Sequence, residues 1–273
     1  MSLTKNKILK YVVIGVIAVL IASLLSKNKK EEKVNILRDY SEILEDGLLK
    51  AVTEYNSISY FVNGDTISGF HYELIQAFAK AKGLKVEIVP EMSFNKRMEG
   101  LADGKYDIIA YGIPINAKLI DSICFTIPIT RAKQILVQRK AEIDSAKYIR
   151  SQIQLAQKTL HVEKGSPAIL RIHNMSNEIA DTIYIQEVDK YAQEQLMAMV
   201  AHGDIDYAVA DEDIARTAID SFPQLDINTG ISFTQFYAWG IKKQSPALCD
   251  SINAWLTEYM QTKAFKKTYS KYF

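Results

Sequence analysis

Apolar residues recur with two different periods along the chain from Val34 onward. Short apolar runs are followed by longer segments in which apolar residues return every three or four positions. The first pattern is typical of strands and the second of helices. Their alternation predicts βαβ units, and therefore an α/β fold with largely parallel sheets.

The segment 69–83 is the clearest predicted helix. Gly83 ends it, because glycine readily takes the left-handed conformation that closes a helix. We expect a strand at 86–89 directly after it, and later helices at 191–201, 212–219 and 246–261. The apolar face of the first helix consists of Leu74, Ile75, Phe78 and Ala81.

Two ten-residue segments follow the same plan. LADGKYDIIA at 101–110 and VAHGDIDYAV at 200–209 each contain the end of a helix, a glycine, an aspartate and an apolar strand. A solenoid would repeat such a unit many times at a short, fixed period. A single echo instead predicts two lobes, each with its own sheet.

The first part of the chain has a different character. The run 11–25 (YVVIGVIAVLIASLL) has no charge and follows Lys5, Lys7 and Lys10. With the apolar residues before Lys10 it approaches the roughly 30 Å of a bilayer core. No small-x-small cleavage site follows the run, so we predict an uncleaved membrane anchor at 1–33 that includes a short tether. A cleaved signal peptide is the alternative.

Charge and cysteine content exclude several classes of protein. The formal net charge is +1, and no long basic run occurs outside the N-terminal flanks, which argues against nucleic-acid binding. Cys124 and Cys249 are far apart, and we favour two buried free thiols over a disulfide formed in an oxidising compartment. No histidine or cysteine spacing fits a metal or cofactor, and no nucleophile motif is present. We therefore expect no catalytic residues.

Two positions in the second half carry candidate binding chemistry. In Glu163-Lys164-Gly165-Ser166-Pro167, the serine is placed as a helix cap and the proline as the first helical residue. Free N–H groups at such a helix start suit an anionic ligand group, although ordinary capping is the alternative. Asp211 follows an apolar strand, where it either contacts a ligand at the sheet edge or caps the next helix.

The order of seven short motifs resembles that of the family 3 extracellular solute-binding proteins. No single motif is specific, but their order over residues 35–273 is. The motifs are GFHYEL at 69–74, GKYD at 104–107, INAKL at 115–119, FTIPI at 125–129, VQRK at 137–140, GS at 165–166 and DYAVAD at 206–211.

The resemblance implies a periplasmic binding protein fold of type II, with two α/β lobes joined by two crossover strands. It assigns 34–129 and 236–273 to lobe 1, and 130–235 to lobe 2. The ligand-binding residues that it indicates are Asn56, Ser57, Tyr60, Tyr111, Gly112 and Asn116 in lobe 1, and Glu163, Gly165, Ser166 and Asp211 in lobe 2. At the position of the arginine that grips an amino acid's carboxylate in relatives stands Leu119, so a free amino acid would lack that contact.

A closer resemblance is to the binding-protein-like N-terminal half of membrane-bound lytic murein transglycosylases F. It is carried by YNSISYF at 55–61, DIDYAVAD at 204–211 and YAWGIK at 237–242. In those enzymes a lysozyme-like catalytic domain follows, and this chain ends where that domain would begin. The resemblance therefore implies a binding domain without its catalytic partner.

Together these observations predict a monomeric, non-enzymatic solute-binding protein, anchored at the periplasmic face of the cytoplasmic membrane or released to the periplasm after signal cleavage. It would close on a small polar ligand that is amino-acid-like, a short peptide or a cell-wall fragment. Its partner would be an inner-membrane transporter of the ABC type or an envelope complex. The alternatives are a regulatory envelope domain without a transport role and a dehydratase-like enzyme on the same fold.

Overall fold

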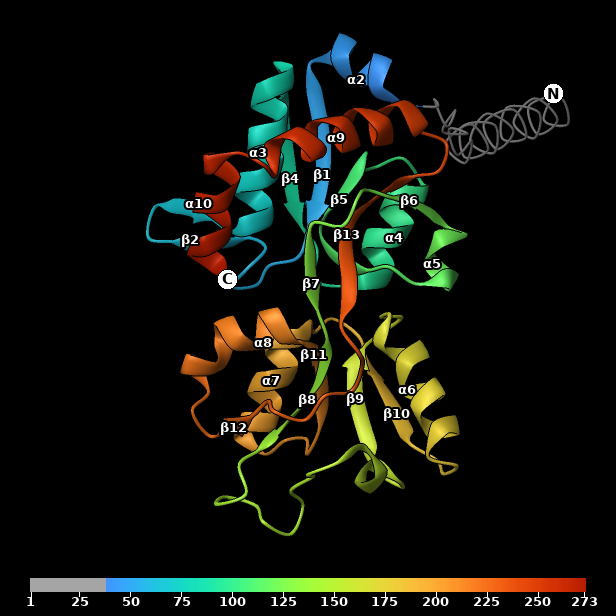
Figure 1. Ribbon diagram of the computed structural model, residues 1–273, viewed down its shortest axis with the longest axis vertical. Helices are drawn as coiled ribbons and strands as arrows, with labels where there is room; N and C mark the ends of the chain where they lie inside the picture. The colour runs from blue at the N-terminus through green and yellow to red at the C-terminus, as the bar shows by residue number, and fades with distance from the viewer. Residues whose placement is uncertain (1–37) are drawn as a thin grey trace, which may run out of the picture. The chain divides into compact units, whose positions relative to one another are not determined.

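The computed structural model describes residues 38–273, which form two mixed sheets with helices packed on both faces (Figure 1). The strands of the first sheet are β1 (Leu48–Thr53), β4 (Lys85–Pro90), β5 (Ile108–Pro114), β6 (Ile123–Phe125), β7 (Thr130–Ala132) and β13 (Gln235–Lys242). Those of the second sheet are β8 (Gln134–Arg139), β9 (Thr159–Glu163), β10 (Tyr184–Val188), β11 (Ala208–Asp211) and β12 (Leu225–Asp226). We call the part built on the first sheet lobe 1 and the part built on the second lobe 2.

The two sheets share the strand order that βαβ connections produce. The first runs β4-β1-β5-β13-β6, with β7 paired to β13, and β1 is parallel to both β4 and β5. The second runs β10-β9-β11-β8-β12, and β9 is parallel to both β10 and β11. This confirms the predicted α/β class. A separate hairpin consists of β2 (Phe61–Asn63) and β3 (Thr66–Ser68).

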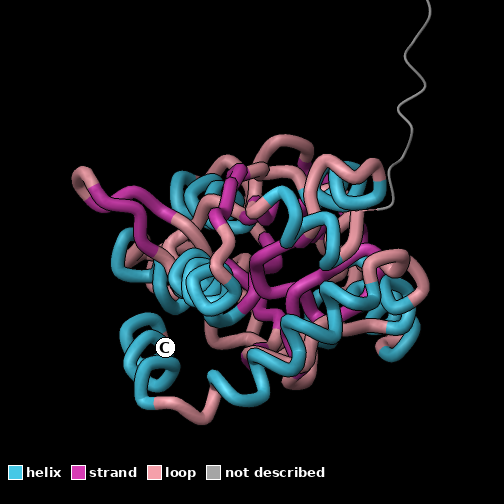
Figure 2. Tube along the Cα trace, turned by 90° about the horizontal axis from the view of Figure 1, so that it is seen from above, coloured by secondary structure: helices cyan, strands magenta, loops and turns pink. Residues whose placement is uncertain are grey.

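Helices cover both faces of each sheet, and in the view of Figure 2 they surround the strands. Lobe 1 carries α2 (Tyr40–Asp46), α3 (Phe70–Lys82), α4 (Phe94–Ala102), α5 (Ala117–Ile120), α9 (Pro246–Tyr259) and α10 (Lys263–Tyr272). Lobe 2 carries α6 (Ala168–Glu178), α7 (Gln193–His202) and α8 (Glu212–Ala218), and two 3₁₀ turns occupy Gln152–Leu155 and Ile219–Ser221.

The period of two along each strand explains why both faces are covered. On β5, Ile108 packs into the apolar cluster beneath α3 and α9, while Ile109 packs into the cluster beneath α4. On β11, Val209 faces the α6 side and Ala208 the α7 and α8 side. Because successive side chains of a strand point to opposite faces, an apolar strand needs helices on both sides.

Two strands carry the chain between the lobes. β7 ends at Ala132 in the first sheet and β8 begins at Gln134 in the second, while β13 returns the chain and pairs with β7. The predicted boundaries at 129/130 and 235/236 fall directly before β7 and within β13. These strands therefore connect the two lobes.

The predicted helix at 69–83 is confirmed as α3, which ends at Gly83 in the left-handed conformation. Its buried face includes Leu74, Ile75 and Phe78 as predicted. Ala81 is exposed, and Ala79, four residues after Ile75, is buried in its place. The apolar face therefore turns slightly further around the helix than the sequence pattern indicates.

The prediction of two free thiols is wrong. Cys124 on β6 and Cys249 on α9 form a disulfide. The helix α9 packs beside β6 in lobe 1, which brings together two cysteines 125 residues apart in the chain. A sequence separation of this size gives no local signal of the pairing.

The predicted anchor and tether at 1–33 lie outside the described residues. Within residues 38–273, every helix is too short or too polar to span a bilayer.

Candidate ligand-binding site

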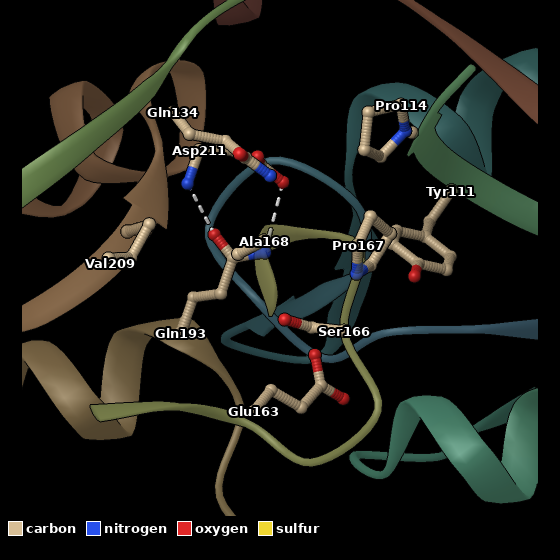
Figure 3. Close-up of a pocket in the computed structure, with 12 residues that line it drawn as sticks. Tyr111, Pro114, Gln134, Glu163, Ser166, Pro167, Ala168, Gln193, Val209 and Asp211 are labelled. Atoms are coloured by element: carbon tan, nitrogen blue, oxygen red, sulfur yellow. Dashed lines mark hydrogen bonds between the residues drawn. The ribbon is translucent and has the colours of Figure 1, made fainter. Parts of the chain in front are cut away.

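The carboxyl ends of the parallel strands in the two lobes face each other across a small cavity (Figure 3). Its volume is about 20 Å³, enough for roughly one water molecule. Lobe 1 contributes Tyr111, Gly112 and Pro114 from β5. Lobe 2 contributes Gln134, Glu163, Ser166, Pro167, Ala168, Gln193, Val209, Ala210 and Asp211. Open α/β sheets bind their ligands at this edge.

Asp211 is the last residue of β11, and its side chain turns into the cavity. Its Oδ1 accepts a hydrogen bond from the Tyr237 hydroxyl at 2.6 Å, and its Oδ2 accepts one from Gln193 Nε2 at 3.0 Å. The backbone N–H of Asp211 donates to Gln193 Oε1 at 2.6 Å, which completes a two-bond clasp (Figure 3). Asp211 makes no side-chain cap on α8, so the capping alternative for its carboxylate is wrong.

The charge of Asp211 is not neutralised by the described part of the chain. Asp211 is 6% exposed, and its carboxylate pairs with no cationic side chain of residues 38–273. Burial raises the pKa of Asp211 to about 7, and the nearby Asp213 and Glu54 carboxylates act in the same direction. A carboxylate has about four acceptor positions, so the two donors leave room for a further hydrogen bond.

Other carboxylates gather around this junction. Burial is the main cause that raises the pKa of Glu163, Glu194 and Asp213, and Glu54 adds repulsion to each. Glu54 stands directly after β1 and is completely buried. The junction is therefore strongly acidic, and a cation would relieve the mutual repulsion.

One arginine faces these acids from lobe 1. Arg97 on α4 is completely buried, and its Nη2 lies 2.9 Å from both Glu54 Oε2 and Glu163 Oε1. Its guanidinium carbon lies 4.5 Å from the centre of the Tyr111 ring. Its Nη1 donates to the Glu91 carbonyl at 2.6 Å. Arg97 thus joins a carboxylate of each lobe in one buried ion cluster.

A further polar contact crosses between the lobes. The backbone N–H of Ser57 in lobe 1 donates to Glu194 Oε1 of α7 at 2.7 Å. The Tyr237–Asp211 and Arg97–Glu163 contacts also join the two lobes in this arrangement.

Five of the ten predicted site residues line the cavity. They are Tyr111, Gly112, Glu163, Ser166 and Asp211. Ser166 does not cap α6, which begins at Ala168 with Pro167 in the cap position, one residue later than predicted. The N–H groups of Gly165 and Ser166 already have acceptors, because Gly165 donates to Glu187 and Ser166 to the Glu163 carbonyl.

Ser57 contacts lobe 2 through Glu194 rather than the cavity, whereas Asn56 and Tyr60 make their contacts within lobe 1. Asn56 is buried in the loop after β1, where its Oδ1 accepts from the N–H groups of Ile58 and Ser59. Tyr60 makes edge contacts with Tyr55 and Tyr72.

Asn116 does not reach the cavity either. It caps α5 by accepting from the Leu119 N–H at 3.0 Å. It lines a separate surface hollow beside Phe233.

Sequence reasoning missed Gln134, Gln193 and Arg97. Gln134 begins the strand after a crossover, and Gln193 begins a helix, positions at which the chain gives no chemical signal. Arg97 has no motif around it in the sequence, and only the contact of α4 with Glu163 of lobe 2 makes it a buried cation at the junction. Leu119 packs against the apolar cluster beneath α4. The buried cation that residues 38–273 place at this junction is Arg97 of α4.

Among residues 38–273, no group of three or more His, Cys, Asp or Glu side chains has the geometry to hold a metal ion.

The model of bacterial extracellular solute-binding proteins, family 3, matches residues 49–273. The chain belongs to this family. The match covers both sheets and every residue that lines the cavity. The predicted family resemblance is thereby confirmed.

Similar proteins fall into two groups. Membrane-bound lytic murein transglycosylases F from Photobacterium profundum and Desulfosudis oleivorans are 26% and 28% identical over 82% and 85% of this chain. The aligned part is 42% and 50% of those relatives, so the chain spans about half the length of the relatives it matches.

Solved structures of binding proteins have the same fold. The arginine-bound form of truncated ArgBP from T. maritima is 25% identical, with a TM-score of 0.69 over 81% of this chain and 100% of that one. The ancestral amino acid-binding protein AncCDT-1, a precursor of cyclohexadienyl dehydratase, is 23% identical with a TM-score of 0.70, over 85% of this chain and 98% of that one. At that identity the second likeness shows the fold alone.

Proposed function

We propose that this chain is an extracytoplasmic solute-binding protein whose two lobes close on a small ligand carrying a protonated amine. The observation that carries the proposal is Asp211, a buried carboxylate at the junction of the lobes with no cationic partner in residues 38–273. A charge-assisted hydrogen bond from an ammonium or guanidinium group would neutralise it. The family match and the arginine-bound relative support the same class of ligand.

The ligand enters a more open arrangement than the one described. A cavity of about 20 Å³ is smaller than any amino acid, so the lobes must separate before a ligand can bind. Movement about β7 and β13 provides such a route, since a two-stranded connection acts as a hinge. On closure the ligand would contact Tyr111 and Gly112 from one lobe and Asp211 and Gln193 from the other.

Leu119 narrows the choice of ligand. It replaces the arginine that relatives use for an amino acid's carboxylate, so a neutral free amino acid would bury its carboxylate without that partner. Losing such a charged contact costs on the order of 2–5 kcal/mol, or roughly 30- to several-thousand-fold in affinity. The preferred ligand therefore carries an amine and keeps its acidic groups away from the position of Leu119. A compound with a cationic side chain, a short peptide or a cell-wall fragment meets this requirement.

The cellular setting follows from the same proposal. Residues 1–33 would anchor the protein to the cytoplasmic membrane, with the two lobes, 34–129 plus 236–273 and 130–235, at the periplasmic face. We propose a monomer without enzymatic activity that delivers or reports its ligand to a transporter or envelope complex.

Titration calorimetry of the purified protein tests the proposal. The panel consists of the twenty amino acids, amine-bearing peptides and muropeptides, with N-acetylated forms of each binder as matched controls. We expect micromolar binding of at least one amine-bearing compound and at least tenfold weaker binding of its N-acetylated form. Equal affinity for the two forms would show that the amine is not recognised.

Binding should also depend on pH in a defined direction. The pKa of Asp211 is raised to about 7, so its carboxylate is protonated and neutral below that pH and charged above it. An ammonium binds the charged form, so affinity should be about tenfold lower at pH 6 than at pH 8 for a single titrating carboxylate. The groups that act on Asp211 are Asp213, Glu54, Tyr237 and Gln193. They surround it both when it is protonated and when it is charged. Affinity that rises as the pH falls would contradict this role for Asp211.

A second function is favoured by the transglycosylase relatives: a regulatory domain that recognises cell-wall fragments without transporting them. Incubation of the protein with purified peptidoglycan distinguishes recognition of cell-wall fragments from their enzymatic cleavage. We expect binding of muropeptides with no release of soluble fragments above a heat-inactivated control. Turnover above that control would overturn the assignment as a binding protein.

A further inference from the structure

Glu163 of lobe 2 lies in an anion site that belongs to lobe 1. Its Oε1 accepts a hydrogen bond from the Phe94 N–H at 2.5 Å and one from Arg97 Nη2 at 2.9 Å. Phe94 is the first residue of α4, so this N–H has no acceptor within the helix. A helix start beside a guanidinium is a favourable place for a carboxylate.

The site is built into lobe 1 rather than created by Glu163. Arg97 is completely buried, and it is fixed by the Glu91 carbonyl, by Glu54 and by the Tyr111 ring, all from lobe 1. Glu163 comes from the end of β9 in the other lobe and is 4% exposed. If the lobes separate, Arg97 and Phe94 stay together while Glu163 leaves.

Glu163 contacts only one of the N–H groups that the Arg97 guanidinium offers to a carboxylate. A carboxylate can engage two N–H groups of an arginine side by side, in a fork. Here one oxygen of Glu163 contacts Nη2, and Arg97 Nε has no hydrogen-bond partner among residues 38–273. A carboxylate that is not attached to β9 could use both N–H groups.

We propose that Arg97 and the Phe94 N–H form a carboxylate-binding site on lobe 1, and that Glu163 occupies it as an internal ligand that closes the lobes. An external carboxylate takes the same site when Glu163 is withdrawn or removed. Because Glu163 itself bridges the lobes, the closed arrangement does not require a ligand at Asp211. A ligand with an acidic group competes with Glu163 for Arg97. This inference does not depend on which compound Asp211 recognises.

The test uses the full chain and formate, the smallest carboxylate, as the probe. In Glu163→Ala, sodium formate should bind at least tenfold more tightly than it binds the wild-type protein, measured by calorimetry against sodium chloride at equal ionic strength. Glu163→Gln keeps the shape of the side chain and should give an intermediate affinity, which provides a second variant if the alanine form folds poorly. Glu178→Ala removes a glutamate that pairs with Arg171 inside lobe 2, and should leave the response of the wild-type protein unchanged.

The position of the lobes is read out separately. Spin labels at the exposed positions Lys80 on α3 and Asn177 on α6 report the distance between the lobes. We expect a longer mean distance in Glu163→Ala than in wild type, and a return toward the wild-type distance on addition of formate. An unchanged distance in Glu163→Ala, or formate binding equal to that of wild type, would overturn the proposal. Neither result would bear on amine binding at Asp211, which the calorimetric panel measures.

Discussion

Replacing Arg97 with methionine is expected to lower the free energy of unfolding by about 3–5 kcal/mol, because one partner of a buried ion cluster is lost. Arg97 is completely buried between Glu54 and Glu163, which are 0% and 4% exposed. Without the guanidinium, two carboxylates remain in a site that excludes water. Urea denaturation of both proteins at pH 8, where the glutamates of the unfolded chain are ionised, measures the difference.

Arg216→Met is the matched control. Arg216 pairs with Glu212 one turn away on α8, and its side chain is 69% exposed. Exposed pairs of this kind contribute a few tenths of a kcal/mol, so the control should unfold almost like wild type. Combining Arg97→Met with Glu163→Gln should recover part of the loss, because one of the two unpaired charges is removed. A loss below about 1 kcal/mol for Arg97→Met would mean that the cluster is solvated.

Asp211→Asn is expected to weaken the binding of an amine-bearing ligand at least tenfold while stabilising the protein at alkaline pH. The amide of asparagine has the size and shape of the carboxylate but no charge to attract an ammonium. The pKa of Asp211 in the folded chain is about 7, above its ordinary value of 3.8, so the folded chain holds this proton more tightly than the unfolded chain does. Stability from this group is therefore complete below about pH 4 and is lost as the pH rises through 7.

Denaturation of the wild type and of Asp211→Asn at pH 5 and pH 8 measures this effect. From pH 5 to pH 8, the free energy of unfolding should fall by about 2–3 kcal/mol more in the wild type than in the variant. Tyr237→Phe serves as a comparison, because it removes the hydroxyl that donates to Asp211 but leaves the carboxylate in place. Equal pH dependence in wild type and Asp211→Asn would mean that Asp211 is ionised in the folded chain at both pH values.

The local features of the fold were readable from the sequence. The apolar spacing and Gly83 define α3, and the short apolar strand predicted before Asp211 is β11, which ends at Asp211. Both are set by residues within a few positions of each other. The two-lobed arrangement was predicted from the family motifs, because the order of the motifs along the chain follows the order of the strands.

The features that were missed depend on contacts between distant parts of the chain. Arg97 and Glu163 are 66 residues apart, and Cys124 and Cys249 are 125 apart. No spacing rule brings such residues together, because their meeting depends on how α4 and α9 pack. The contact of Asn116 is local by comparison, since its side chain accepts from the N–H of Leu119 in the helix immediately after it.

The most direct test of the account is a crystal structure of the protein with an amine-bearing ligand identified by calorimetry. We predict that the ligand lies between the lobes, with its amine nitrogen within hydrogen-bond distance of a carboxylate oxygen of Asp211 and with contacts from Tyr111 or Gly112 on the opposite lobe. Ligand density away from this junction, or an amine paired with another carboxylate while Asp211 keeps only Tyr237 and Gln193, would contradict it.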